Sequence, residues 1–458
     1  MKTLLKPLSL AFFVAATLPT QTAYIPPFLP SNTIPATGSS PYFCRAIGGP
    51  SIEVGKSLIQ TSDGGYAIAG TTTSFGAGGW DVYVVKLDAS GNLQVTKTIG
   101  GPKNEEGNSL IQTSDGGYAI AGYTESFGAG QLDVYVIKLD ANGNLQWTKT
   151  IGGPGGEIGH SLIQTSDGGY AIAGYTYFFG AGEWDVYVVK LDANGNLQWT
   201  KTIGGPEDEE GYSLIQTSDG GYAIAGYTYS FGAGKEDIYV VKLDANGNLQ
   251  WTKTIGGPES DWSSSLIQTS DGGYAIAGYT KSFSVGGADV YVVKLDANGN
   301  LQWTKTIGGP ASEIGYSLIQ TSDGGYAITG TTSSDELAAY FGPAEADIYV
   351  VKLDANGNLQ WTKTIGGPEH DRGLSLIQTS NGGYVIAGYT KSFGAGEADV
   401  YVVKLDKNGN ACCAVSQTSQ VGSGGRLGSA TPSIGGGGKL TAPTPTTSSG
   451  GTLSSQCP

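Results

Sequence analysis

Seven acidic residues recur along this chain at a spacing that could build a ring of carboxylates. Five successive intervals are 52 residues and the sixth is 58. The residues are Glu53, Glu105, Glu157, Glu209, Asp261, Glu313 and Asp371. Because carboxylate oxygens are ligands that Ca²⁺ prefers, one interpretation is a calcium site at the mouth of a central channel. The alternative is that each carboxylate accepts backbone N–H bonds in its own or a neighbouring loop. Repetition in every copy favours the structural role.

A second acidic position opens a predicted strand in every copy. Its members are Asp81, Asp133, Asp185, Asp237, Asp289, Asp347 and Asp399. We expect these residues to cap loop amides, because a catalytic acid needs one environment that shifts its pKa and seven equivalent sites do not provide it. The Asp-x-Asn-Gly-Asn segments lack the later bidentate glutamate of calcium loops, and we interpret them as type I turns with a glycine bulge.

Two sets of aromatic residues differ in their placement. One set occupies a single repeat position and is predicted to pack between repeats: Trp147, Trp199, Trp251, Trp303 and Trp361. The other set is predicted to lie in loops that vary between copies: Trp80, Trp184 and Trp262, accompanied by Tyr177, Tyr229, Tyr212 and Tyr316. Exposed aromatic side chains can stack on sugar rings or anchor a protein partner. The alternative is packing against the next loop.

The elements that position these residues come from a repeated unit. The tetrapeptide Ile-Gly-Gly-Pro marks seven copies, beginning at Ile47, Ile99, Ile151, Ile203, Ile255, Ile307 and Ile365. In the second copy, residues 109–113, 118–124, 133–139 and 145–151 are predicted strands, rich in β-branched and aromatic residues and separated by Asp-Gly and Asn-Gly turns. The third strand is apolar on both faces, which indicates a sheet buried on both sides. The sequence therefore predicts an all-β, seven-bladed β-propeller of four-stranded blades over residues 42–415.

The ends of the repeat array predict how the ring closes. The last copy loses its pattern after Asn410, whereas Phe43 to Gly49 aligns with the fourth strands. We therefore expect the N-terminal strand to complete the last blade and to hide two exposed edges. This closure would bring Cys44 close to Cys412 and Cys413, and a disulfide to one of these two is predicted, with the choice left open.

The terminal segments differ in composition from the repeats. Residues 1–23 combine Lys2 and Lys6 with a short apolar run and are predicted to be a signal peptide, with an N-terminal membrane anchor as the alternative. Residues 24–41 form a Pro-rich linker. Residues 416–458 are a Gly/Ser/Thr/Pro-rich low-complexity tail, predicted to be a flexible linker or an extended stalk. In the tail, Gly-Gly-x-Leu recurs every 13 residues, at Gly424, Gly437 and Gly450. We expect an exported protein, extracellular or in the cell envelope, with no transmembrane span in the mature chain.

Charge and motifs exclude several classes of function. The formal net charge is −15 and no lysine or arginine cluster is present, which argues against nucleic acid as a partner. The two histidines, His160 and His370, lie in separated copies, so the sequence supports neither a Ser/His/Asp triad nor a metal-binding histidine cluster.

The repeated motif resembles a known family. Gly117 to Thr124, Asp133 to Asp140 and Leu145 to Trp147 are similar to the blades of secreted bacterial and archaeal β-propeller repeat proteins. The similarity covers residues 42–410, about four fifths of the chain. It implies the architecture but no particular activity.

The variable positions indicate where a function could reside. The short turns barely differ between copies, whereas the fourth-to-first and second-to-third connections do, and both open on the same face of a propeller. We therefore predict a non-catalytic binding module for a glycan or protein ligand on this face, with no cofactor beyond calcium at the acidic ring. Neutral drift in exposed loops would produce the same pattern of variation. The alternative is a structural envelope or surface protein attached through its tail. An enzyme is the least supported class.

Overall fold

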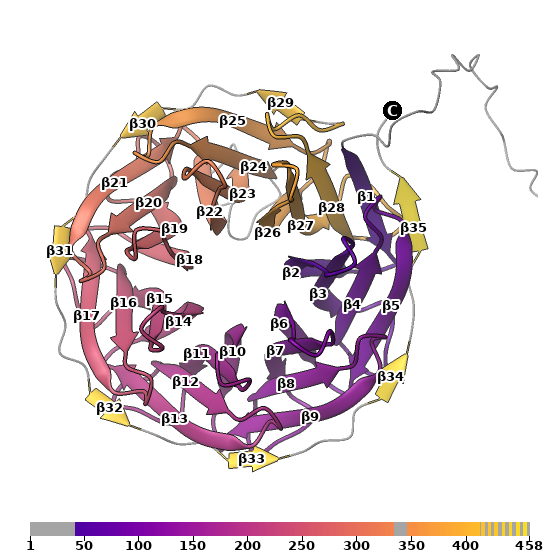
Figure 1. Cartoon of the computed structure of the whole chain (residues 1–458), viewed down its shortest axis with the longest axis horizontal. Helices are drawn as coiled ribbons and strands as arrows, with labels where there is room; N and C mark the ends of the chain where they lie inside the picture. Colours follow the sequence, from indigo (N-terminus) through magenta and orange to yellow (C-terminus); the bar gives the residue numbers. More distant parts are fainter. Residues whose placement is uncertain are drawn as a thin grey trace, which may run out of the picture. The chain divides into compact units, whose positions relative to one another are not determined.

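The computed structural model describes residues 42–333 and 346–412, together with seven short segments between residues 414 and 455. These residues belong to one compact unit. Seven antiparallel sheets stand around a common axis, with the first strand of each blade innermost, as Figure 1 shows. The chain therefore folds as a seven-bladed β-propeller, as the sequence predicted. No helix in the described ranges has the length and apolarity needed to cross a membrane.

The strands of blades 1 to 6 follow one another along the chain, from the inner edge outwards. Blade 1 contains β2 (Glu53–Gln60), β3 (Tyr66–Thr72), β4 (Asp81–Leu87) and β5 (Leu93–Gly100). Blade 2 contains β6 (Glu105–Gln112), β7 (Tyr118–Thr124), β8 (Asp133–Leu139) and β9 (Leu145–Gly152). Blade 3 contains β10 (Glu157–Gln164), β11 (Tyr170–Thr176), β12 (Asp185–Leu191) and β13 (Leu197–Gly204).

Blade 4 contains β14 (Glu209–Gln216), β15 (Tyr222–Thr228), β16 (Asp237–Leu243) and β17 (Leu249–Gly256). Blade 5 contains β18 (Asp261–Gln268), β19 (Tyr274–Thr280), β20 (Asp289–Leu295) and β21 (Leu301–Gly308). Blade 6 contains β22 (Ser312–Gln320), β23 (Tyr326–Ser333), β24 (Ala346–Leu353) and β25 (Leu359–Ile365). Blade 7 contains β26 (Asp371–Gln378), β27 (Tyr384–Thr390), β28 (Asp399–Leu405) and, as its fourth strand, β1 (Phe43–Gly48).

The hydrophobic core lies between neighbouring blades. Ala119 and Val136 of blade 2, for example, pack in one cluster with Leu162 and Tyr187 of blade 3. The second strands carry small residues because the next blade packs directly on them, and Ala119 and Ala121 are fully buried there.

Blade 7 closes the ring with strands from both ends of the repeat array. β1 pairs antiparallel with β28, and Ala46 lies opposite Tyr401. A disulfide joins Cys44 to Cys412 next to this pairing. The structure thus forms one of the two bridges that the sequence left open, while Cys413 lies outside the described residues.

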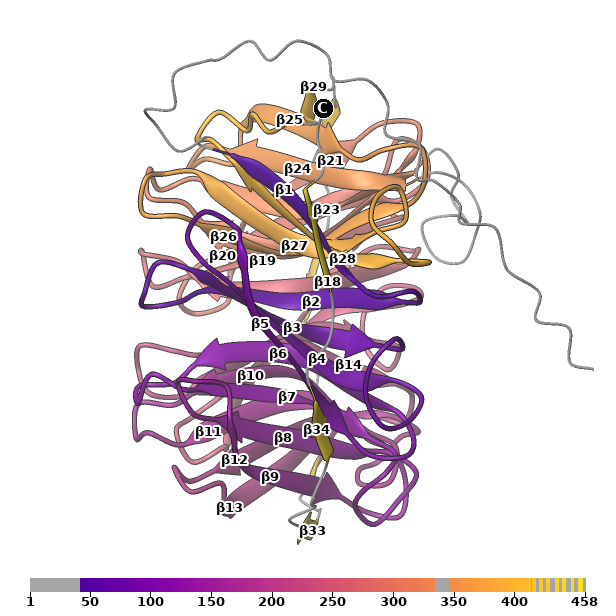
Figure 2. The ribbon, with the colours of Figure 1, turned by 90° about the vertical axis from the view of Figure 1, so that its right-hand side faces the viewer.

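The C-terminal tail forms a belt around the ring. Its described segments are β29 (Ala414–Ser416), β30 (Gln420–Gly422), β31 (Arg426–Gly428), β32 (Ser433–Gly435), β33 (Lys439–Thr441), β34 (Thr446–Ser448) and β35 (Thr452–Ser455). Each pairs antiparallel with the outermost strand of one blade, in the order of blades 6, 5, 4, 3, 2, 1 and 7. Figure 2 shows β33 and β34 on the rim of the ring. The prediction of a flexible linker or stalk is wrong for these segments, because every outer edge strand offers unpaired N–H and C=O groups to a passing chain.

The spacing of the belt explains the 13-residue period of the tail. Successive belt strands begin six or seven residues apart, so two blades correspond to one period. The leucine of each Gly-Gly-x-Leu unit is paired with the isoleucine of an Ile-Gly-Gly-Pro marker: Leu427 with Ile255, Leu440 with Ile151, and Leu453 with Ile47.

Candidate functional site

A β-bulge interrupts the innermost strand of every blade. In blade 1, Gly55 pairs with Gly70 and Ser57 with Ala69, so that Lys56 has no partner across the strand pair. The same register shift occurs three residues after the acidic position in the other six blades. A bulge leaves its extra residue out of the ladder and changes the direction of that side chain. The repeat thus places one specially oriented side chain per blade near the axis.

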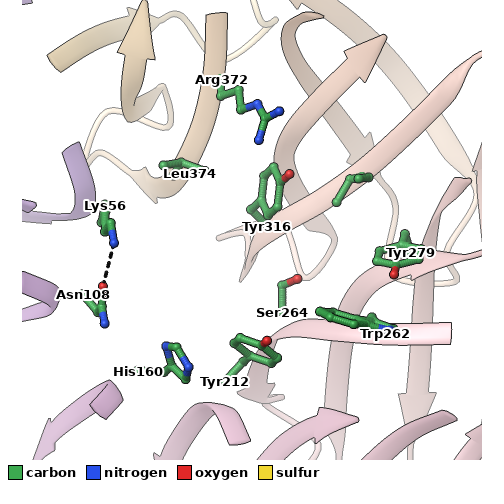
Figure 3. A pocket seen from close by; sticks show the side chains of 11 residues that line it. Lys56, Asn108, His160, Tyr212, Trp262, Ser264, Tyr279, Tyr316, Arg372 and Leu374 are labelled. Atoms are coloured by element: carbon green, nitrogen blue, oxygen red, sulfur yellow. Dashed lines mark hydrogen bonds between the residues drawn. The ribbon is translucent and has the colours of Figure 1, made fainter. Parts of the chain in front are cut away.

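The seven bulge residues converge on one cavity and differ in chemistry. They are Lys56, Asn108, His160, Tyr212, Ser264, Tyr316 and Leu374, which represent six residue types in otherwise similar strands. All seven line a cavity of about 440 Å³, which we call the central pocket (Figure 3). Trp262, Tyr279, Ile314 and Arg372 complete its wall. A ring of near-identical blades therefore encloses a pocket with no sevenfold symmetry.

Aromatic rings form a continuous row along blades 3 to 5, which we call the aromatic arc. It consists of Trp184, Tyr175, His160, Tyr212, Tyr227, Trp262 and Tyr279. Trp262 stacks on Tyr227 with centroids 4.4 Å apart and on Tyr279 with centroids 5.8 Å apart. His160 lies 4.7 Å from the ring of Tyr212. Mutual stacking fixes the orientation of these rings.

The charged side of the central pocket comes from blades 7 and 1. The Lys56 ammonium forms an ion pair with Glu106 and donates a hydrogen bond to Asn108 Oδ1 at 2.9 Å. Asn108 Nδ2 in turn donates to the Gly159 carbonyl at 3.0 Å. The Arg372 guanidinium lies 6.0 Å from the centre of the Tyr389 ring, within range of a cation–π contact. Two cations and no carboxylate line the pocket.

His160 is a neutral member of this site. Burial, reinforced by the positive charge of Lys56, lowers the pKa of His160 to about 3. Its Nε2 atom lies 3.9 Å from a Glu210 oxygen, and it has no hydrogen-bond partner. Burial raises the pKa of Glu210, although the Tyr227 hydroxyl donates to its carboxylate at 2.8 Å. At neutral pH the imidazole can thus donate or accept a hydrogen bond but carries no charge.

The structure divides the aromatic residues that the sequence selected as ligand contacts. Tyr212, Trp262 and Tyr316 line the central pocket, but they lie in strands β14, β18 and β22, so their predicted placement in loops is wrong. Trp184 does lie in a loop and stacks on Tyr175 at the outer end of the arc, with centroids 5.2 Å apart. The other three predicted residues do not line the pocket and are exposed: Trp80 to 37%, Tyr177 to 58% and Tyr229 to 44%.

The seven carboxylates of the predicted acidic ring are buried beneath the fourth-to-first connections. In blade 2, Glu105 accepts the Gly101 N–H at 2.6 Å and the Thr124 hydroxyl at 2.7 Å. A backbone N–H bond of the same kind occurs in every blade. These contacts are the structural role that the sequence analysis favoured. None of the seven lines the central pocket, and among the described residues no three His, Cys, Asp or Glu side chains gather as a metal site. Calcium binding here stays a prediction.

Six of the seven aspartates that open the third strands cap loop amides, as expected, while the loop before Asp347 lies outside the described residues. Asp133 accepts the N–H groups of Ala129 at 3.0 Å and Gly130 at 3.2 Å. Its other oxygen approaches the Glu157 carboxylate, since the two oxygens lie 2.3 and 2.5 Å from the point that a Cβ of Gly152 would occupy. An equivalent carboxylate pair lies between every two neighbouring blades. Burial raises the pKa of Asp133, and the first glycine of each Ile-Gly-Gly-Pro marker provides the space for a pair.

The repeated tryptophans pack between blades, as predicted. Trp147 of blade 2 contacts Tyr170 of blade 3 edge-on, with centroids 5.8 Å apart. Trp199, Trp251, Trp303 and Trp361 make the same contact with the following blade.

The bulge residues escaped the sequence analysis although a signal existed. Tetrapeptides that begin at the acidic position read EVGK, EEGN, EIGH, EEGY, DWSS, EIGY and DRGL. Their second and fourth letters vary most. All seven fourth-letter residues line the pocket, as do three of the second-letter residues, Trp262, Ile314 and Arg372. This variation was predicted to lie in loops. The structure places it within the innermost strands.

Comparisons with known proteins agree with a propeller of repeats. A family model described as the outer membrane protein assembly factor BamB matches residues 84–267. The regulatory protein FlaEY of Caulobacter vibrioides is 29% identical over 239 residues, which are 46% of this chain and 25% of that protein. This chain thus spans a quarter of the length of that relative.

Solved structures match this chain at low sequence identity and low TM-score. Sqt1 from Chaetomium thermophilum matches with 14% identity and a TM-score of 0.43, over 79% of this chain and 98% of that chain. A protein of unknown function from Bacteroides caccae matches with 11% identity and a TM-score of 0.36, over 65% of this chain and 93% of that chain.

Proposed function

We propose that this seven-bladed β-propeller is a non-catalytic binding module that holds one asymmetric ligand in the central pocket. One observation carries the proposal. Seven equivalent bulges direct six different residue types into a single cavity, while the strands around them are nearly the same in every blade. Packing alone would favour the same side chain at equivalent positions, whereas recognition of a ligand without sevenfold symmetry requires different ones.

The composition of the pocket supports binding. Ligand sites are typically clefts of roughly 300–1,000 Å³ with aromatic walls and a few oriented polar groups. The central pocket falls in this range and combines the aromatic arc with Asn108, His160 and Ser264. The sequence analysis placed the ligand on the loop face. We now propose that the pocket is the main contact and that exposed loop residues such as Trp80 and Tyr177 extend it.

The relatives favour interaction over catalysis. The matching family model is described as an assembly factor and the Caulobacter relative as a regulatory protein, and both descriptions support a protein ligand. We propose no cofactor. The alternative of a structural envelope protein attached through its tail loses support, because the described tail segments pair with the ring.

We also propose that the protein is exported to the cell envelope or beyond. The basic and apolar start of the chain, the disulfide between Cys44 and Cys412, and the description of the matching family as an outer membrane assembly factor all support export. Fractionation of cells that produce the full chain tests this directly. Retention of all the protein in the cytoplasm with its thiols reduced would contradict it.

The binding proposal can be tested by making the seven bulges alike. A variant with serine at all seven bulge positions, as Ser264 already provides in blade 5, should keep the fold and lose the asymmetric pocket. Thermal-shift screening of glycan and peptide panels should give ligands for the wild type that this variant no longer binds. The comparison variant is Trp80→Ala with Tyr177→Ala, which should weaken binding much less than the serine variant does. If the serine variant binds normally and the loop variant does not, the ligand occupies the loop face. If no panel member stabilises the wild type, the binding function itself is refuted.

A further inference from the structure

We propose that the central pocket takes an acidic sugar, whose ring lies against the aromatic arc and whose carboxylate meets Arg372. This inference rests on the proposed binding function and names its ligand class. Three properties of the pocket wall support an acidic sugar: the flat aromatic surface, the groups that can hydrogen-bond to hydroxyls, and the sign of the charge.

The aromatic surface suits a ring with one apolar face. Tyr212 and Trp262 both line the pocket, and their planes are inclined by only 27°. Trp262 also stacks on Tyr227 and Tyr279, and these contacts fix its orientation. Little side-chain freedom would therefore be lost when a ligand binds. A pyranose presents C–H groups on one face and hydroxyls around its rim, which matches a flat wall bordered by polar groups.

The polar groups suit hydroxyls in particular. Ser264 and the neutral His160 can each donate or accept a hydrogen bond, as sugar hydroxyls can. The buried Nε2 of His160 has no hydrogen-bond partner within the described structure.

The charge of the wall selects an anion. The chain contains 40 acidic and 25 basic residues, yet the residues that line the pocket include Lys56 and Arg372 and no acid. Glu106 compensates the charge of Lys56. Arg372 lies close enough to Tyr316 for its charge to oppose the rise that burial causes in the pKa of that tyrosine. A guanidinium binds a carboxylate in a bidentate manner, so Arg372 is the group that would fix the acid.

The experiment compares two probes that differ only in charge. Digalacturonic acid and its methyl ester are titrated into the full chain by calorimetry, at low and moderate salt. We expect the acid to bind at least tenfold more tightly than the ester. Arg372→Gln should abolish this preference, while Trp262→Ala should weaken both probes about equally. Lys235→Gln, which removes a charge from an exposed surface pair with Glu259, is the matched control and should bind as the wild type does.

Each other outcome has a defined meaning. Equal binding of acid and ester by the wild type, or an unchanged preference in Arg372→Gln, would overturn the assignment of an acidic ligand. Tighter binding of hydrocinnamate or of an acidic peptide than of digalacturonate would replace the sugar by that class. No binding of either saccharide, when the panel still yields ligands that depend on the bulges, refutes the sugar but keeps the binding function. If Trp262→Ala does not fold, Trp262→Phe provides the same comparison with the ring retained.

Discussion

The carboxylates of Asp237 and Asp261 face each other across the backbone of Gly256, between blades 4 and 5. Their nearest oxygens lie 1.6 and 2.8 Å from the point that a Cβ of Gly256 would occupy, and both side chains are fully buried. Burial, together with the negative charge of Asp261, raises the pKa of Asp237 to about 6. Such a pair recurs at every blade interface, so the ring contains seven places where two acidic side chains are buried together.

These pairs predict that the protein is most stable in mild acid. For Asp237 and Asp289, the folded-state pKa of about 6 exceeds the ordinary value of 3.8. The native state therefore binds more protons than the unfolded chain, and stability falls as the pH rises through 6, by up to about 3 kcal/mol per group. In the opposite direction, the hydrogen bond from the Thr113 hydroxyl and the ion pair with Lys138 lower the pKa of Asp115 to about 2, and their contribution is lost below about pH 4. Melting temperatures measured from pH 3 to pH 8 should peak near pH 4–5. A rise between pH 5 and pH 7.5 would contradict the raised pKa values of these acids.

Adjacent glycines offer a sharp test of the space that the pairs occupy. A Cβ on Gly308 would come within 2.2 Å of an Asp289 oxygen and 2.5 Å of a Glu313 oxygen, whereas a Cβ on Gly309 would meet nothing within 4 Å. Gly308→Ala should therefore lower the free energy of unfolding by about 3 kcal/mol or more, because two buried carboxylates must move. Gly309→Ala should change it by less than about 0.5 kcal/mol. Urea titrations of both variants provide the measurement, and equal effects would refute the steric argument.

The disulfide should stabilise the closure of the ring. Cys44 and Cys412 are 368 residues apart in sequence, so their bridge restricts the unfolded chain strongly. The double variant Cys44→Ser with Cys412→Ser should lose roughly 2–5 kcal/mol. Reduced wild type and oxidised wild type, compared by denaturant unfolding, give a second estimate. A variant without the bridge that matches the oxidised wild type would show that β1 alone secures the last blade.

The repeated and the exposed tryptophans should behave in opposite ways. Trp199 packs edge-on against Tyr222 of the next blade with centroids 5.8 Å apart, while Trp80 is 37% exposed. Trp199→Ala should lower the free energy of unfolding by about 3 kcal/mol through lost packing, and Trp80→Ala should leave it nearly unchanged. Thermal unfolding distinguishes the two. Similar losses in both variants would mean that the loop tryptophan is a packing residue.

Removal of the belt tests its contribution to the rim. A chain that ends at Cys412 keeps the disulfide and all four strands of every blade. The outer edge of each fourth strand, which pairs with a belt strand in the full chain, is then unpaired. We expect a folded ring with a lower melting temperature and increased self-association, since unpaired edges promote pairing between chains. Light scattering as a function of concentration gives the measurement. A truncated chain that stays monomeric with an unchanged melting temperature would show that the belt contributes nothing to stability.

The sequence was sufficient for the propeller, the strand exchange in blade 7 and the role of Asp133 and its equivalents. Each follows from local signals: β-branched runs, Asn-Gly turns and the alignment of Phe43 to Gly49 with the fourth strands. The bulges were not predicted, because a bulge is a property of two paired strands. Nothing in residues 53–60 alone shows that Lys56 has no partner across from it, or that its side chain lines a pocket with six others.

The belt could not be predicted for a different reason. Its strands are three or four residues long, and they lie in a Gly/Ser/Thr/Pro-rich segment that lacks an alternating apolar pattern. Their pairing depends on edges supplied by β1 and by the outer strands of all the other blades, far away in sequence. The 13-residue recurrence of Gly-Gly-x-Leu indicated that the tail follows a repeating structure. It could be interpreted only once the spacing between neighbouring blades was known.

The course of the belt also sets an order of assembly during synthesis. β1 leaves the ribosome before any blade exists, yet it lies between β28 and β35, which are made more than 350 and more than 400 residues later. The belt then visits blades 6 to 1 against the direction of translation and ends beside β1. The described tail segments, which follow every blade in the sequence, thus contact all seven blades. A ring with a missing or misfolded blade would leave part of the belt unpaired. Complete pairing of the belt therefore requires that all seven blades have folded.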